Sequence, residues 1–277
     1  MLSKLLKYEF RATALYFLPI YIALLVVSGF ATVVHNLSMR AGNSPFLNHT
    51  MVLFSSLYAL LAVSLAITTF VVIIIRFYKN LLGSEGYLMF ILPVTTEQNI
   101  LAKLIPAVTW FMGSCLLGIL TIFPVLFGSY RGAWNFFFPQ ENFSAMEFAE
   151  WVTFLFLIFA GMVIGLATTF LFYYFCMIVG QTFNSHKFLA SVITYLVLQG
   201  VFQVIGLVSI FSLAGLVENL AEGSFLWQFL AWLPITDQNA GAFILGGMAI
   251  SDLFALAVAV GIFFLDSVLL RKKLNLT

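Results

Sequence analysis

Six long apolar stretches alternate with polar segments along the chain. A membrane-spanning helix needs about 20 predominantly apolar residues, and each stretch reaches that length. The pattern therefore predicts an all-α, polytopic membrane protein with six transmembrane helices in a single transmembrane domain, residues 1–277. The predicted spans cover residues 12–34, 51–75, 104–127, 151–179, 188–215 and 243–270.

The chain begins with an amphipathic segment, residues 1–11, in which leucines and Phe10 alternate with charged residues such as Lys4 and Arg11. This pattern predicts an N-terminal helix that lies in the membrane interface. The apolar run that follows is 23 residues long and free of charge. A signal peptide has an apolar region of roughly 7 to 15 residues, so we expect an uncleaved first span.

The stretch between the second and third spans, residues 76–103, differs from the other loops. Its centre, residues 85–93, is aromatic and apolar; it is too short to cross a bilayer and too hydrophobic for a solvated loop. Thr95 and Gln98 match the S/T-x-x-E/Q capping box, so the next helix is expected to begin at Thr95. The centre must bury itself against the rest of the chain, the membrane surface or a second protein.

Composition and charge agree with a membrane protein and predict its orientation. Hydrophobic residues make up 62% of the chain and charged residues 8%, whereas a soluble domain has about 25% charged residues. With both termini inside, ten of the twelve Lys and Arg residues lie in segments predicted to be cytoplasmic, and only Arg40 and Arg131 lie outside. This distribution follows the positive-inside rule and predicts cytoplasmic N- and C-termini.

Residues 83–105, GSEGYLMFILPVTTEQNILAKLI, resemble the first cytoplasmic loop of ABC-2 type export permeases, and the ends of the chain, MLSKLLKYEFRATALYFLPIY and LLRKKLNLT, agree with that family. The resemblance implies a protein of the bacterial plasma membrane whose cytoplasmic loop, residues 76–103, forms a coupling helix that docks in a separate ATPase subunit. An interfacial helix that only seals the membrane surface is the alternative for this loop. The residues expected to carry the ATPase contact are Glu85, Tyr87, Leu88, Met89 and Phe90.

The resemblance further implies the function of a permease subunit in an ATP-binding cassette exporter. Its cargo would be hydrophobic or amphipathic: a drug, an antimicrobial peptide, a lipid or a glycan. The expected partners are an ABC ATPase (nucleotide-binding) subunit, a second permease copy or homologous permease, and membrane lipids, but no nucleic acid.

The sequence contains none of the nucleotide-binding or catalytic motifs considered. It has no G-x-x-x-x-G-K-[ST] loop, so we expect a transport subunit that is not itself an enzyme and ATP hydrolysis in a partner chain. No catalytic constellation, cofactor site or metal site is expected. The alternative function is a secondary transporter or channel without an ATPase partner, which predicts ionisable groups at mid-span. Five of the predicted spans have no Asp, Glu, Lys or Arg in their cores.

Polar residues within the predicted spans leave two interpretations open. Gln199 and Gln203 lie four residues apart on one face of the fifth span, where buried amides either tie helices together or line a polar translocation path. In the fourth span, Gly161 and Gly165 have the spacing that lets helices approach closely.

The last span carries two acids. Counting back about 20 residues from Arg271 puts the start of the span near Ser251, so Asp252 is expected to cap the outer end of the helix; a substrate or proton role is the alternative. Asp266 is expected to pair with Arg271 at the cytoplasmic interface. Residues 242–250 either lengthen this helix or form part of a re-entrant turn.

Overall fold

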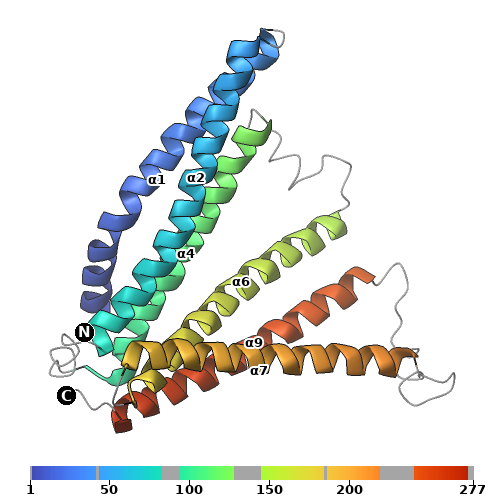
Figure 1. Ribbon diagram of the computed structural model, residues 1–277. Helices are drawn as coiled ribbons and strands as arrows, with labels where there is room; N and C mark the ends of the chain where they lie inside the picture. Colours follow the sequence, from blue (N-terminus) through green and yellow to red (C-terminus); the bar gives the residue numbers. More distant parts are fainter. Residues whose placement is uncertain are drawn as a thin grey trace. The chain divides into compact units, whose positions relative to one another are not determined.

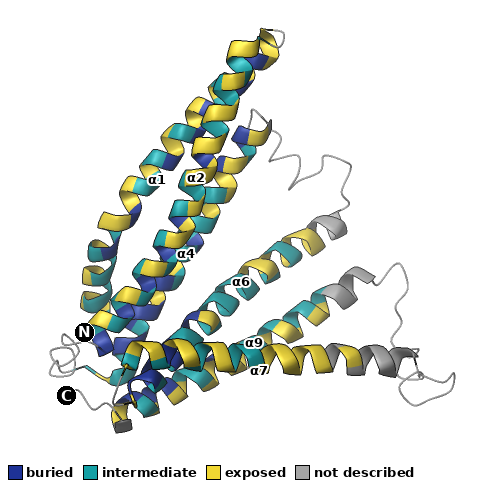
Figure 2. Cartoon of the chain, viewed as in Figure 1, coloured by how far each residue is buried: buried dark blue, intermediate teal, exposed yellow. Residues whose placement is uncertain are grey.

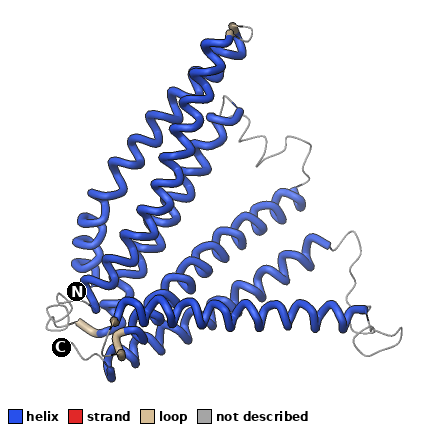
Figure 3. The backbone as a smooth tube through the Cα atoms, viewed as in Figure 1, coloured by secondary structure: helices blue, strands red, loops and turns tan. Residues whose placement is uncertain are grey.

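The described secondary structure is entirely helical. The computed structural model describes residues 2–41, 44–82, 94–127, 145–183, 186–218 and 240–273. In chain order (Figure 1, Figure 3) the elements are α1 Leu2–Arg40, α2 Pro45–Phe77, the short π-helix η1 Tyr78–Leu82, α4 Thr96–Phe127, α6 Ala145–Gly180, α7 Lys187–Glu218 and α9 Ala240–Lys273. They fall into two compact units: α1, α2, η1 and α4 form unit 1, and α6, α7 and α9 form unit 2.

Six helical stretches are long and apolar enough to cross a membrane. Each has at least 22 residues, and about 20 residues of helix span the hydrocarbon core. Exposed residues run along the helices of both units (Figure 2), and large apolar side chains such as Leu15, Phe156 and Phe211 are among them. Such surfaces are stable against lipid tails. The prediction of an all-α protein with six spanning helices is confirmed, and the chain is a multi-pass membrane protein by helix length and hydropathy.

The N-terminal segment does not form a helix of its own. α1 runs without a break from Leu2 to Arg40, so the interfacial helix predicted over residues 1–11 is wrong as a separate element. The physical reason is that nothing in this stretch breaks a helix: the first proline is Pro19 and the first glycine is Gly29. A proline inside a membrane helix is tolerated, and α1 continues through Pro19.

The helices extend into both ends of the predicted coupling loop. α2 is prolonged by η1 as far as Leu82, and α4 begins at Thr96. The backbone N–H of Gln98 donates to Thr95 Oγ1 at 3.4 Å, so Thr95 caps α4 as the sequence predicted. At the other end of the chain, α9 is unbroken from Ala240, which makes residues 242–250 helix and not a re-entrant turn.

Apolar side chains at heptad spacing pack the helices of unit 1 together. The buried cluster comprises Phe17, Leu24, Ala31, Tyr58, Leu65 and Val125. Its members on α1 follow one another at intervals of seven residues, and so do its members on α2, which is the spacing of helices that cross at a shallow angle. Phe17 also stacks on Trp110 of α4, with ring centroids 4.7 Å apart and an interplanar angle of 18°.

Polar contacts join α4 to α1 and α2 within the same unit. They are Trp110 Nε1 to Thr13 Oγ1 at 2.7 Å, Ser114 Oγ to Tyr21 OH at 2.9 Å and to Thr69 Oγ1 at 3.1 Å, and Thr121 Oγ1 to Tyr58 OH at 3.0 Å. On α4 they all come from one face, at positions 110, 114 and 121. We call these contacts the polar rungs. Between helices in lipid, such hydrogen bonds are worth about 0.6 kcal/mol each on average, so together they favour this arrangement of the three helices.

Unit 2 is more open than unit 1. α6 contacts both α7 and α9, most extensively α9, and the three helices converge at one end and separate toward the other (Figure 1). In the most apolar window of α7, 6% of the residues are buried, against 22% in that of α9. α7 therefore packs on α6 near one end and diverges from α9 along the rest of its length.

The packing of unit 1 predicts a difference between two apolar residues on α1. Phe17→Ala should lower the free energy of unfolding by about 3 kcal/mol, because it leaves a cavity beside Trp110 that lipid does not fill. Leu15→Ala, at a side chain that is 77% exposed, should leave stability nearly unchanged. The measurement is detergent-induced unfolding followed by circular dichroism, and equal shifts for both variants would contradict the assigned core.

Candidate functional site

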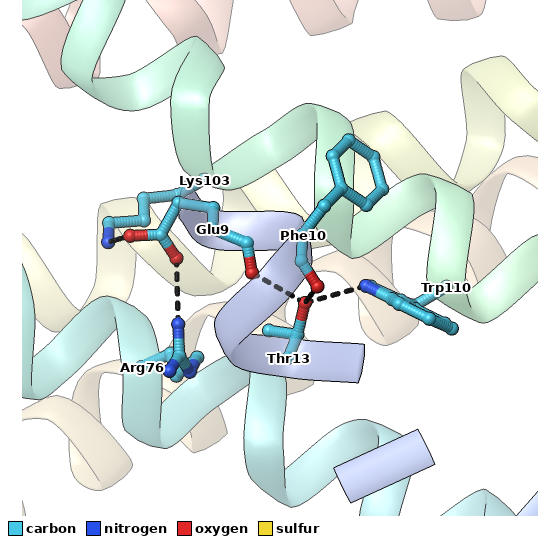
Figure 4. Close-up of polar contacts among 6 residues, drawn as sticks. All are labelled: Glu9, Phe10, Thr13, Arg76, Lys103 and Trp110. Carbon is cyan, nitrogen blue, oxygen red and sulfur yellow. Dashed lines mark hydrogen bonds and ion pairs between the residues drawn. The ribbon is translucent and has the colours of Figure 1, made fainter. Parts of the chain in front are cut away.

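A single carboxylate joins three helices at one end of unit 1 (Figure 4). Glu9 of α1 accepts a hydrogen bond from Arg76 Nη1 at 3.0 Å through Oε2, and its Oε1 accepts one from Lys103 Nζ. Arg76 lies in the last turn of α2, and Lys103 lies near the start of α4. The two bases are 67 and 94 residues from Glu9 along the chain. We call these three residues the Glu9 cluster.

Neighbouring contacts hold the backbone of α1 at Glu9 in place. Thr13 Oγ1 donates within its own helix, 2.7 Å from the carbonyl oxygen of Glu9 and 3.1 Å from that of Phe10. The same oxygen accepts the indole N–H of Trp110 from α4 (Figure 4). The Phe10 and Trp110 ring centroids are 6.3 Å apart. The main chain and the side chain of Glu9 are therefore both tied to α4.

Burial makes the charges of the cluster interdependent. The Lys103 side chain is 3% exposed and that of Glu9 13%, whereas Arg76 keeps 24% of its surface exposed. A nearly buried ammonium is unfavourable without an anion nearby, and the Glu9 carboxylate supplies that anion. Because the cluster holds one acid and two bases, the more exposed Arg76 is the base that can also be solvated.

The Glu9 cluster brackets the segment that the sequence singled out. Arg76 precedes residues 83–95 and Lys103 follows them, so the helices that lead into and out of this segment are both joined to α1. The predicted docking residues lie outside the described residues; they are Glu85, Tyr87, Leu88, Met89 and Phe90. The structure shows that the helices on both sides of this segment are bonded to Glu9 of α1.

Unit 2 contains a groove of about 490 Å³ between α6, α7 and α9. It is lined by Gly165, Thr168, Thr169, Phe172, Tyr173, Tyr195, Gln199, Phe202, Ala255, Val258 and Ile262. We call this cavity the unit 2 groove. Of the two predicted amides, Gln199 lines it, while Gln203 is exposed one turn further along α7.

Asp252 lies inside α9 and faces α6. The predicted capping role is wrong because the helix begins well before this residue, at Ala240. A Cβ atom on Gly161 would lie 2.6 Å from Asp252 Oδ1, so the absence of a side chain at Gly161 makes room for the carboxylate. The other oxygen, Oδ2, is buried without a hydrogen-bond partner in the described part of the chain. Gly165, by contrast, has open space where a Cβ atom would be and lines the groove.

Asp266 does not pair with Arg271. Its side chain is fully buried, and neither carboxylate oxygen has a hydrogen-bond partner among the described residues. The prediction failed because residues five apart lie on different faces of a helix, whereas neighbours are three or four apart. Across the described ranges, no group of three or more His, Cys, Asp or Glu side chains could hold a metal ion.

The Glu9 cluster was not predicted from the sequence. Its partners are too far apart along the chain for any spacing rule to connect them. One signal was available: Glu9 is the only acid before Glu85, and it lies among the bases Lys4, Lys7 and Arg11. A single acid in a basic helical segment suggests that its partner is a base on another helix.

Comparison of the chain with protein-family models, with characterised proteins and with solved structures gave no match. The resemblance of residues 83–105 to export permeases therefore stays a prediction. Helix length and hydropathy establish a multi-pass membrane protein.

Removing the acid of the Glu9 cluster should weaken unit 1. Glu9→Gln should lower the free energy of unfolding by about 3 kcal/mol, because it takes a counter-charge away from the nearly buried Lys103. Adding Lys103→Gln should restore part of the loss, and Glu150→Gln, at an exposed acid on α6, is the matched control. Detergent unfolding of the wild type, Glu9→Gln, Lys103→Gln and the double variant forms a double-mutant cycle; additive effects of the two single changes would contradict the pairing.

Two glycines one turn apart on α6 should respond differently to the same change. Gly161→Ala should be about 1 kcal/mol less stable than Gly165→Ala, because its methyl group comes within 2.6 Å of Asp252 Oδ1 and the carboxylate must shift. The methyl group of Gly165→Ala meets nothing, and both changes gain the helix propensity of alanine. Thermal unfolding in detergent compares the two variants, and equal stability would refute the contact between Gly161 and Asp252.

Proposed function

We propose that this chain is the permease subunit of an ABC exporter in a bacterial plasma membrane. It would move a hydrophobic or amphipathic cargo, with energy from a separate ATPase subunit. A second permease, either a copy or a homologue, would complete the translocation path.

The Glu9 cluster is the observation that carries this proposal. Bringing Lys103 and Glu9 out of water requires desolvation, and a loop that only closed the membrane surface would not need its two flanks joined in this way. A loop that transmits a displacement from another protein needs both flanks joined, so that the displacement reaches the helices. If residues 83–95 are displaced, the bonds of Glu9 to Arg76 and Lys103 make α1, α2 and α4 move together.

The chemistry of the loop supports a protein partner. Tyr87, Leu88, Met89 and Phe90 are large apolar side chains of the kind that anchor interfaces, and Glu85 can meet a base at the rim. The basic residues on both sides of the loop favour the cytoplasmic side, where an ATPase has access. These features agree with the resemblance to ABC-2 type export permeases.

In the proposed mechanism, closure of two ATPase subunits pushes on the loops of two permease subunits. Unit 1 responds as a body because the polar rungs and the Glu9 cluster link its helices. Rigid-body movement of packed helices at an interface is a common way to convert a local push into a change of access. The path would then open outward or laterally toward the bilayer.

A secondary transporter is the second candidate, and the position of Asp252 favours it. The candidate span containing this residue runs from Leu245 to Arg271, and Asp252 lies roughly 9 Å along the helix from its midpoint. An ionisable group at such depth is a feature of proton- or ion-coupled transport. Cargo transport into vesicles driven by ATP, as against a proton gradient, separates the two candidates.

The test is purification of the tagged full-length chain from its native host in mild detergent, with ATP hydrolysis assayed in the eluate. We expect a stoichiometric ATPase subunit, and we expect Tyr87→Ala with Phe90→Ala to reduce its recovery at least tenfold, as for loss of two interface anchors of about 1–2 kcal/mol each. The matched control is Tyr16→Ala with Phe30→Ala, at exposed positions on α1.

Two outcomes contradict the proposal. If the wild-type chain elutes without an ATPase while known membrane complexes survive the same detergent, the exporter assignment fails. If the ATPase is recovered equally with Tyr87→Ala and Phe90→Ala, these two side chains do not form the docking contact.

A further inference from the structure

We propose that the unit 2 groove binds a hydrophobic organic cation, which its aromatic walls surround and the Asp252 carboxylate attracts. As a statement about cargo this rests on the proposed function, whereas the binding itself requires no ATPase. The ligand class follows from the groove's size, the polarity of its walls and the uncompensated acid beside it.

The size of the groove suits one small organic molecule. Its volume of about 490 Å³ lies within the range of roughly 300–1,000 Å³ that is usual for small-molecule sites. The groove exists because α7 diverges from α9 while both contact α6. It is therefore a feature of how the three helices are arranged and not of one side chain.

Aromatic rings from two helices form much of the wall. Phe172 and Tyr173 of α6 face Tyr195 and Phe202 of α7. Ring centroids are 5.3 Å apart for Tyr173 and Tyr195, 5.7 Å for Phe172 and Phe202, and 6.1 Å for Phe172 and Tyr195. The faces of such rings attract cations, most strongly where water is excluded.

The two threonine hydroxyl groups in the wall offer acceptors to a ligand and not donors. Thr168 Oγ1 donates its hydrogen to the carbonyl oxygen of Ile164 at 2.8 Å, and Thr169 Oγ1 donates to that of Gly165 at 2.8 Å. Their lone pairs remain available for a positively charged or hydrogen-donating group. None of the lining residues is charged, so the walls provide no base to hold an anion.

Asp252 supplies a negative charge close to one end of the groove. It faces Gly161, one helical turn from the lining residue Gly165, and it is three positions from the lining residue Ala255. Its buried Oδ2 has no hydrogen-bond partner within the described residues. A carboxylate without compensation is unfavourable inside a membrane, and a bound cation would provide the compensation.

The described bases of unit 2 are too far from Asp252 to compensate its charge. Along α9, Arg271 is separated from Asp252 by roughly 28 Å of helix. Lys187 begins α7 close to the end of α6 at Gly180, and Gly180 is again roughly 28 Å along α6 from Gly161. Within the described part of unit 2, these bases do not compensate Asp252, and a cationic ligand would supply the positive charge.

The experiment uses two probes of nearly identical shape and opposite charge. Tetraphenylphosphonium and tetraphenylborate are each applied by equilibrium dialysis to the full-length chain in neutral-lipid nanodiscs, with empty nanodiscs subtracted. We expect saturable binding of the phosphonium cation and none of the borate anion above the lipid background. The absence of ATPase from these nanodiscs separates a failure of this inference from a failure of the exporter assignment.

Three variants locate the binding. Asp252→Asn should weaken phosphonium binding about ten- to a hundredfold, the loss expected when one interaction with a charged group is removed. Asp266→Asn, a buried acid on the same helix but outside the groove, should bind as the wild type does. Gly165→Leu, at a position with open space around it, should fill the groove and reduce binding without altering any charge.

Each variant is first checked for monodispersity and melting temperature, and Gly165→Leu keeps the test decisive if Asp252→Asn does not fold. Unchanged binding by a folded Asp252→Asn or by Gly165→Leu overturns the proposal. So does equal binding of both ions, which would mark the groove as a crevice for lipid tails. Absence of saturable phosphonium binding to the wild type also overturns it, and then lipid or a second copy of the chain covers the groove.

Discussion

Helices inside a bilayer do not associate to escape water, because lipid tails are as apolar as their own side chains. Unit 1 must therefore be held by contacts that lipid cannot supply. The bonds of Glu9 with Arg76 and Lys103 are the strongest of these, since they pair charges that would otherwise be exposed to a poorly solvating environment. The polar rungs and the stacking of Phe17 on Trp110 extend the same three-helix contact along α4. Because α2 and α4 are held in this way, both ends of the candidate coupling segment, residues 83–95, are attached to the three-helix unit.

Unit 2 follows a different principle. One close contact between its helices depends on a missing side chain, since Gly161 leaves the space that the Asp252 carboxylate fills. α7 contacts α6 but diverges from α9, so an aromatic groove remains between the three helices. The helices of unit 1 are thus joined by paired polar groups, whereas unit 2 has an acid, Asp252, without a hydrogen-bond partner for Oδ2 among the described residues, beside the unit 2 groove. This division agrees with separate roles in receiving a push and in holding a ligand.

The sequence predicted those features that depend on local composition. Long apolar runs identified the six spans, and the capping pattern at Thr95 located the start of α4, because both effects act within a few residues. Asp252 was misplaced because a span of about 20 residues, counted back from Arg271, is shorter than the actual helix, which continues through the apolar residues 242–250. Asp266 was paired by proximity in sequence, although helical geometry separates positions five apart. The contacts of Glu9 join residues far apart along the chain, and only the folded structure brings them together.

The serine and threonine hydroxyl groups of the polar rungs each have a second acceptor in their own helix. Ser114 Oγ lies 2.9 Å from the carbonyl oxygen of Trp110, Thr69 Oγ1 lies 2.7 Å from that of Leu65, and Thr121 Oγ1 lies 2.7 Å from that of Leu117. If α4 shifts, the protons of these three hydroxyl groups stay bonded to backbone oxygens of their own helices. Tyr21, Tyr58 and the indole of Trp110 bond only across helices and would lose their partners. The ion pairs of Glu9 have no such local substitute. Unit 1 is thus tied most firmly at the end that holds Glu9, and further along α4 its serine and threonine hydroxyl groups tolerate small shifts without leaving a proton unsatisfied.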